Sequence, residues 1–354
     1  MMVPFLRGLL MRCLLSIFLG IVVAAASAAP PALAAEPPVH LIFDTDIGND
    51  IDDVLALAMI HALQSRGECR LLAVTITKDC PLAAAYTDAV NTFYGRGDIP
   101  IGLVHNGATP DSGRFLPLVN QQNAHAPRYP HDLKGSEAPG GVAVLRQTLA
   151  GCAHRSVVIA QVGFSTNLAR LLDSPADDFS PLTGRELVAQ KVRLLSVMAG
   201  AFEPINGGRH LEYNVVKDIS AAKKIAIDWP TEVLYSGYEI GLAMRYPARS
   251  IMEDYRWQPD HIVAASSIAY EPPPHNRPTW DLTSVLAVVR PSHGYFGMSE
   301  PGHVIVDDDG GTQFEPDADG LHRYLTVDAT QAARGVEAFV NLCSQPVVPA
   351  KPLP

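Results

Sequence analysis

The strongest constraint in this chain is a ten-residue run, Asp44 to Asp53, in which five residues are aspartate. It follows the β-like segment His40-Leu-Ile-Phe43 and precedes Val54 to Leu63, whose Ala, Leu and Met residues favour a helix. In open parallel sheets ligands bind beyond the carboxyl ends of the strands, so this run lies where a site is expected. Because crowded carboxylates repel one another, a cation is expected among them. Calcium is favoured over magnesium, since several carboxylates and carbonyls can converge on it.

The rest of the chain alternates between strand-like and helix-like segments. Further strands are expected at 70–77, 156–161, 192–198 and 232–235, and further helices at 83–94, 167–172, 221–227 and 282–289. This alternation predicts βαβ units, hence an α/β fold. We expect a single domain with a mainly parallel open sheet flanked by helices and a Rossmann-like core. Two loop-rich stretches, 103–140 and 267–280, are expected to be either site walls or plain surface excursions.

The composition bounds the class of protein. The chain has 354 residues, 47% hydrophobic and 18% charged, as globular proteins have. Its net charge of −10 argues against a nucleic-acid partner, because such binding needs clustered Lys and Arg. Cysteines 69, 80, 152 and 343 show no zinc-binding spacing, and any disulfide pairing among them stays open.

The N-terminus resembles a targeting segment. Arg7 and Arg12 precede an apolar run, and Ala-x-Ala sites follow at residues 26–28 and 32–34. We expect residues 1–34 to be a cleaved signal peptide, with a membrane anchor as the less favoured alternative. The expected product is an exported protein, periplasmic or secreted, with no membrane contact after cleavage. A domain over residues 38–345 and a Pro-rich tail over 346–354 would follow.

The acidic run has two competing explanations. Phe43-Asp-Thr-Asp46 is also how a haloacid-dehalogenase-like phosphatase begins, but such an enzyme does not need the second pair, Asp52-Asp53. That pair could instead be ordinary acidic residues at a helix N-terminus. Neither alternative accounts for all five aspartates.

Residues 44–57 resemble the N-terminal signature of the inosine-uridine preferring nucleoside hydrolase family, D-x-D-x-G-x-D-D before an apolar helix. This chain has two extra residues before the final Asp pair, so Asp50 competes with Asp52 for the family's position. Three further matches occur in the family's order: 163–169, 198–214 and Trp280-Asp281. Together they span residues 40 to about 290.

The resemblance implies calcium as cofactor, ribonucleosides as substrates and the following site residues. Asp46 would bind calcium and act as the general base for water. The other metal ligands would be Asp53, Asp281 and Thr166, the last through its carbonyl. Ribose hydroxyls would be held by Asp52, Asn206, Glu212 and Asn214. A homo-oligomer is a further expectation that the resemblance allows.

Several of these residues also have structural explanations. Asn206 precedes Gly207-Gly208 and suits a turn. Thr166 could cap the following helix. Glu212 and Asn214 alternate around a tyrosine, as on a solvated strand face.

Base preference rests on Trp280. Many family members that accept pyrimidines have His before the last Asp, as a candidate acid for the leaving base, whereas the purine-preferring branch has Trp. Trp280 would therefore stack on a purine, unless it only packs in the core. His275 is a weaker candidate acid.

We therefore expect a calcium-dependent hydrolase of purine ribonucleosides that releases ribose and free base. The alternatives are a noncatalytic calcium-dependent nucleoside- or sugar-binding protein on the same scaffold, and the phosphatase.

Overall fold

The computed structural model describes residues 37–124 and 126–347. The proposed signal peptide, 1–34, and most of the Pro-rich tail lie outside the described residues. Within those residues, no helix combines the length and the apolar character needed to cross a bilayer. Cys69, Cys80, Cys152 and Cys343 are free thiols, and all but Cys152 are buried.

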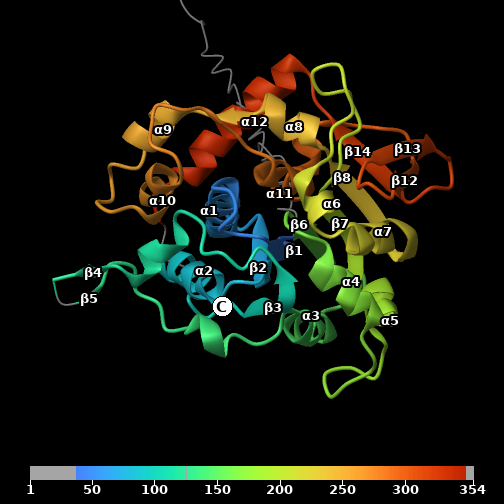
Figure 1. The fold of residues 1–354 in the computed structure, drawn as a ribbon, viewed down its shortest axis with the longest axis horizontal. Helices are drawn as coiled ribbons and strands as arrows, with labels where there is room; N and C mark the ends of the chain where they lie inside the picture. Colours follow the sequence, from blue (N-terminus) through green and yellow to red (C-terminus); the bar gives the residue numbers. More distant parts are fainter. Residues whose placement is uncertain (1–36, 125, 348–354) are drawn as a thin grey trace, which may run out of the picture. The chain divides into compact units, whose positions relative to one another are not determined.

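One large sheet organises the described chain (Figure 1). Its strands are β1 (Val39–Thr45), β2 (Cys69–Lys78), β3 (Ile101–Ala108), β6 (Val157–Gln161), β7 (Val192–Met198), β8 (Glu232–Ser236), β11 (Gly297–Met298), β12 (Gly302–Val306), β13 (Thr312–Pro316) and β14 (His322–Thr326). The order is β13-β12-β14-β8-β7-β6-β1-β2-β3, with β11 beside β14. The strands from β14 to β3 are parallel, whereas β11, β12 and β13 pair in antiparallel fashion.

Helices cover both faces of this sheet (Figure 1). They are α1 (Asp52–Ser65), α2 (Pro81–Phe93), α3 (Gly141–Ala150), α4 (Thr166–Asp173), α5 (Gly184–Lys191), α6 (Tyr213–Lys217), α7 (Ile219–Asp228), α8 (Tyr238–Ala243), α9 (Ala248–Glu253), α10 (Ile262–Tyr270), α11 (Asp281–Val289) and α12 (Ala329–Cys343). The short elements are η1 (Leu116–Asn120), η2 (Gly135–Glu137), η3 (Pro291–His293), β4 (Gln122–Asn123), β5 (Ala126–Pro127), β9 (Arg245–Tyr246) and β10 (Arg277–Pro278).

Two apolar cores lie on opposite faces of the sheet. Side chains alternate between faces along a strand, so Leu41 and Phe43 enter one core and Ile42 enters the other. The first core contains α1, α2 and α11, and the second contains α3, α4 and α5. Strands covered on both faces are apolar throughout, which is why β6 reads Val-Val-Ile-Ala.

The position of β1 determines where a ligand site can form. β1 lies between β2 and β6, and the chain leaves it first toward β2 and β3 and later toward β6 and β7. This reversal creates a crevice at the carboxyl end of β1, where ligands bind in open α/β sheets. The acidic run begins at that end.

The structure confirms the predicted α/β class and mainly parallel sheet. Each strand and helix expected from the sequence overlaps an observed element of the same type. The sequence did not reveal the antiparallel strands between residues 297 and 316, whose segments are short and rich in Asp and Gly.

His61 gives the fold a testable pH dependence. Its ring is fully buried, stacks on Tyr94 with the ring centroids 4.7 Å apart, and lies 2.9 Å from Asn91 Oδ1. Burial, reinforced by the charge of Arg96, lowers its pKa from 6.5 to about 3. Because the unfolded chain binds the proton more tightly, the stabilisation is complete above pH 6.5 and declines as pH falls toward 3.

Between pH 6.5 and 4.5 this group should remove about 2 kcal/mol from the free energy of unfolding. Urea unfolding of wild type and His61→Gln at both pH values checks this, with His303→Gln, a half-exposed site, as the control. Equal pH dependence in wild type and His61→Gln would contradict it.

Candidate active site

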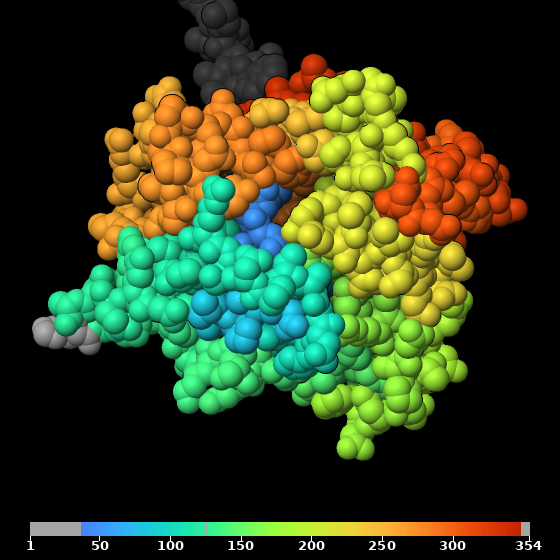
Figure 2. All heavy atoms as spheres, viewed as in Figure 1, coloured from blue at the N-terminus to red at the C-terminus, as the bar shows by residue number. Residues whose placement is uncertain are grey.

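A cavity of about 550 Å³ opens at the carboxyl ends of the central strands. Figure 2 shows it as a hollow with the blue early part of the chain at its floor, between teal, yellow and orange segments. Its lining comes from residues 46–53, 111–114, 212–214 and 270–281, with further side chains from the sheet edge and α8. Both loop-rich stretches therefore contribute walls to the cavity.

Three buried carboxylates meet in this cavity. Asp52, Asp53 and Asp281 each offer an oxygen atom, and the three oxygens lie within 4.8 Å of one another. Asp52 and Asp53 open α1, and Asp281 opens α11, so two helix N-termini bring the group together. A cluster of carboxylate oxygens with this spacing suits a hard divalent cation.

Backbone and hydroxyl groups hold the cluster in place. Asp52 Oδ2 accepts hydrogen bonds from the backbone N–H of Trp280 (2.8 Å) and of Asp281 (3.3 Å). Thr45 donates its hydroxyl to Asp53 Oδ1. These bonds leave the second oxygen of each aspartate without a side-chain donor among the described residues.

The electrostatics of the cluster favour a bound cation. Burial, together with the nearby charge of Asp50, raises the pKa of Asp52 to about 8. Burial and the surrounding aspartates raise the pKa of Asp53 and Asp281 well above the ordinary value. A divalent cation among them would stabilise the ionised forms, so the residues present fit a metal site.

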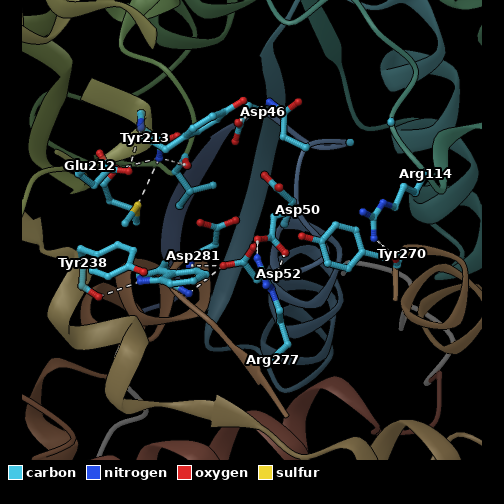
Figure 3. Close-up of a pocket in the computed structure, with 18 of the residues that line it drawn as sticks. Asp46, Asp50, Asp52, Arg114, Glu212, Tyr213, Tyr238, Tyr270, Arg277 and Asp281 are labelled. Atoms are coloured by element: carbon cyan, nitrogen blue, oxygen red, sulfur yellow. Dashed lines mark hydrogen bonds and ion pairs between the residues drawn. The ribbon is translucent and has the colours of Figure 1, made fainter. Parts of the chain in front are cut away.

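Asp46 lies beside this cluster and lines the same cavity (Figure 3). Its Oδ2 accepts a hydrogen bond from Asn49 Nδ2 at 2.6 Å. Burial raises the pKa of Asp46 to about 6, although the Asn49 hydrogen bond and the charge of Lys78 lower it. A buried carboxylate with a raised pKa can serve as a general base near neutral pH.

Lys78 is a buried cation that sequence patterns did not identify. Its side chain is fully buried at the end of β2, and Nζ donates to Asn49 Oδ1 (2.7 Å) and to the carbonyl of Thr109 (2.9 Å). Asn49 in turn bonds Asp46. Lys78 therefore holds the acidic loop against the 103–116 segment.

Glycine is required at one position of the acidic run. Gly48 has a φ of +117°, which L side chains rarely adopt. A Cβ there would also press against Leu116 and Lys78. This loop therefore needs a glycine between Asp46 and Asp50, and the family signature D-x-D-x-G-x-D-D also has a glycine at this position.

Glu212 and Asn214 line the cavity opposite the aspartates. Glu212 caps α6, since its oxygens accept from the backbone N–H of Asn214 (2.8 Å) and Val215 (3.1 Å). Burial raises its pKa to about 7. Asn214 Nδ2 donates to the carbonyls of Val162 (2.8 Å) and Met198. Both side chains are buried, so neither belongs to a solvated strand face.

Three of the predicted residues do not line the cavity: Thr166, Asn206 and His275. The Thr166 hydroxyl donates to Asp218 at 2.6 Å from the start of α4, and Thr166 is not among the lining residues. Val162, which directly follows β6, lines the cavity instead. The chain therefore meets the cavity four residues before Thr166. Asn206 is exposed, has a φ of +52° and occupies the turn between Ile205 and Gly208. Asn206 therefore lies in a turn, as the structural explanation expected.

Aromatic rings form the wall beside Asp281. Trp280 lines the cavity, stacks on Tyr238 with the ring centroids 5.2 Å apart, and donates its Nε1 to the Tyr238 carbonyl at 2.8 Å. Tyr238 and Tyr270 also line the cavity, and neither was predicted. His275 is half-buried and does not line it. An acid role for His275 therefore has no geometric support.

An ion pair completes the wall. Asp50 and Arg277 line the cavity and form two hydrogen bonds, from Nε to Oδ1 (3.1 Å) and from Nη2 to Oδ2. Asp50 therefore has a different partner from Asp52, whose oxygens face Asp281 and the N-terminus of α11. Arg277 was not predicted, and only its place in the 267–280 stretch hinted at it.

Comparisons with solved structures agree with this fold. A plant nucleoside hydrolase superposes with a TM-score of 0.64 at 21% identity, covering 88% of this chain and 100% of its own. A purine-preferring ribonucleoside hydrolase from Gardnerella vaginalis gives 0.65 at 16%, covering 86% and 99%. An inosine-uridine preferring nucleoside hydrolase from Bacillus anthracis gives 0.63 at 16%, covering 86% and 99%.

The sequence was also compared with curated proteins and with models of protein families. A search of curated proteins gives no match. The family model described as inosine-uridine preferring nucleoside hydrolase matches residues 41–333, which is most of the chain and includes every lining residue of the cavity. The chain therefore belongs to the inosine-uridine preferring nucleoside hydrolase family and is an enzyme that hydrolyses N-glycosyl compounds.

Proposed function

We propose that this protein is a calcium-dependent hydrolase of purine ribonucleosides that produces ribose and the free base. The observation that carries the proposal is the buried group of Asp52, Asp53 and Asp281 beside Asp46, at the floor of a cavity large enough for a nucleoside. Membership of the family supports the N-glycosidic bond as the point of attack.

Calcium would be held by Asp46, Asp53 and Asp281, with the carbonyl of Val162 as a candidate fourth ligand in place of that of Thr166. When bound, calcium supplies a fixed positive charge and Lewis acidity beside the reacting groups. The choice of calcium over magnesium rests on the number of convergent carboxylates. Asp52, whose other oxygen has no side-chain donor in the described part of the chain, would bind a ribose hydroxyl.

The chain's own residues would carry out the remaining chemistry. Asp46 is placed to accept a proton from the attacking water. Departure of the base leaves positive charge on the ribose, which the surrounding carboxylates stabilise electrostatically. Glu212 and Asn214, on the opposite wall, would bind ribose hydroxyls and so orient the anomeric carbon.

The preference for purines rests on the aromatic wall. Trp280 and Tyr238 stack on each other beside the acidic group, and Tyr270 lines the same cavity. Large flat rings favour a large flat base, because stacking and burial grow with shared area. Among the structural neighbours, one is a purine-preferring ribonucleoside hydrolase and another is an inosine-guanosine nucleoside hydrolase.

The first test is release of reducing ribose from inosine, adenosine and uridine by the mature protein, with and without a calcium chelator. We expect turnover of purine nucleosides that chelation abolishes and added calcium restores. Uridine turned over as well as inosine would overturn the purine preference. No turnover by folded, calcium-loaded protein would favour a noncatalytic nucleoside- or sugar-binding protein.

We also propose that the enzyme acts outside the cytoplasm, from the targeting pattern of residues 1–34. N-terminal sequencing of the protein recovered from an exporting bacterial host should show cleavage after Ala28 or Ala34. An intact N-terminus in the cytoplasmic fraction would contradict export.

A further inference from the structure

Lys78 brings a buried positive charge to the acidic loop from the neighbouring strand. It is the last residue of β2, and its side chain is fully buried. The stem of the side chain runs close to Gly48, where a Cβ would lie 3.1 Å from Lys78 Cδ. The glycine at position 48 therefore also makes room for this lysine.

The close partners of the ammonium group are neutral oxygens. Nζ donates to Asn49 Oδ1 (2.7 Å) and to the Thr109 carbonyl (2.9 Å). Its one ion pair among the described residues, with the exposed carboxylate of Asp111, spans 3.5 Å. A buried ammonium without a close counter-charge is costly to the fold. The link through Asn49 to the buried carboxylate of Asp46 is therefore the contact that calls for an explanation.

Lys78 determines the orientation of the Asn49 amide. An ammonium group only donates hydrogen bonds, so the amide atom beside Lys78 must be the oxygen. The amide nitrogen is then directed to Asp46 Oδ2 (2.6 Å) and to Thr109 Oγ1 (3.2 Å), which matches its two N–H groups. Asp46 therefore faces a hydrogen-bond donor rather than an acceptor.

We propose that Lys78 is a positioning residue that fixes the Asp46 carboxylate, through Asn49, in the orientation needed to accept a proton from water. This inference rests on the proposed function, because it takes Asp46 as the general base. With Oδ2 held by Asn49, Oδ1 accepts no side-chain hydrogen bond from the described residues and stays available in the cavity. A general base must be held within hydrogen-bonding reach of the proton that it removes.

Loss of the ammonium group would release this arrangement. The Asn49 amide could then rotate and present its oxygen, instead of its nitrogen, to Asp46. Two oxygens facing each other repel, so the carboxylate would spend part of its time turned away from the water. A displacement of about 1 Å can cost about 100-fold in rate, so we expect kcat to fall by between about tenfold and 100-fold.

The test compares kcat and KM for inosine, at saturating calcium, in wild type, Lys78→Met, Asn49→Ala and the double variant. Methionine nearly matches the stem of lysine and carries no charge. Each single variant should lower kcat by between about tenfold and 100-fold and change KM by less than about threefold. Because both changes break the same link, the double variant should be within about twofold of the slower single variant.

A lysine with a purely structural role would give a different result. If Lys78 only fastened the acidic loop, its loss would also move Asp50, Asp52 and Asp53, and KM would rise as kcat falls. Effects of independent changes would multiply in the double variant. Either outcome, or a kcat within about twofold of wild type in Lys78→Met, overturns the proposal.

The matched control is Lys191→Met. Lys191 is also buried, at the end of α5, and its Nζ donates to a carbonyl, that of Cys152, at 2.6 Å. Lys191 does not line the cavity. Its replacement should lower the melting temperature and leave kcat for inosine at the wild-type value.

The proposal stays testable if Lys78→Met fails to fold. Lys78→Gln then takes its place, because glutamine keeps an N–H donor in the buried site but is too short to reach Asn49. Asn49 is half-buried, so Asn49→Ala should fold, and a wild-type kcat in that variant overturns the proposal by itself.

Failure of this inference differs from failure of the proposed function. Ribose release by wild type that is unchanged in the variants overturns only the role of Lys78. No ribose release from inosine by calcium-loaded wild type overturns the proposed function, and the inference with it.

Discussion

Replacing Asp46 with asparagine is expected to lower kcat for inosine by between about 100-fold and 10 000-fold. The carboxylate lies in the cavity beside the group of Asp52, Asp53 and Asp281, and its raised pKa comes chiefly from burial. An amide has nearly the same shape but cannot take the proton of the attacking water. Steady-state kinetics at saturating calcium measure the effect.

The control for Asp46→Asn is Asp173→Asn, at the end of α4, where an exposed carboxylate forms only a surface ion pair with Lys224. That variant should keep wild-type kcat. Calcium titration by calorimetry separates loss of the base from loss of the metal. If Asp46→Asn binds calcium as tightly as wild type and keeps more than a tenth of its kcat, Asp46 is not the general base.

Removal of calcium is expected to lower the melting temperature, and to lower it more at pH 8 than at pH 5. The folded-state pKa of Asp52, about 8, lies above the ordinary value of 3.8, and those of Asp53 and Asp281 are also raised. Stabilisation from such groups is complete below the unfolded pKa and is lost as pH rises through the folded pKa. For Asp52 that loss runs from about pH 4 to pH 8.

Bound calcium reverses this loss, because it stabilises the ionised carboxylates. At a concentration of 100 times Kd it would add about 2.7 kcal/mol. In a domain of this size that corresponds to a melting temperature about 4 °C higher. Differential scanning calorimetry with chelator or calcium, at both pH values, checks the prediction.

Asp281→Asn should reduce the calcium-dependent shift, whereas Asp317→Asn, at a half-exposed surface site, should leave it unchanged. An equal melting temperature with chelator and with calcium at pH 8 would show that Asp46, Asp53 and Asp281 do not form a calcium site. An equal shift with magnesium would remove the argument for calcium.

Much of the fold was predictable because the sheet is parallel and covered on both faces. Such strands are short apolar runs separated by helical segments, as Ser156 to Gln161 and Val192 to Met198 illustrate, and local patterns are enough to find them. The antiparallel β12 and β13 were missed. Both strands are short, β13 has no fully buried residue, and the Asp-rich turn between them resembles a surface loop.

Part of the site was also predictable, for a topological reason. Residues that directly follow a parallel strand must lie at its carboxyl edge, so Asp46, Asp52 and Asp53 were placed there by position alone. Thr166 and Asn206 do not line the cavity in this structure, because a motif match does not show where along a loop the chain leaves a cavity. Thr166 already belongs to α4, and Asn206 to an exposed turn.

The sequence by itself determined the α/β class, the acidic loop at a strand end and the family. Each of these can be recognised from short segments, because the spacing of apolar residues and the order of residues in a motif involve positions only a few residues apart. Only the tertiary structure decided that Asp50 meets Arg277 and that Lys78 meets the acidic loop. The contact between Asp50 and Arg277 joins segments that are more than 200 residues apart in the chain. Local sequence carries no signal of the packing that brings such segments together.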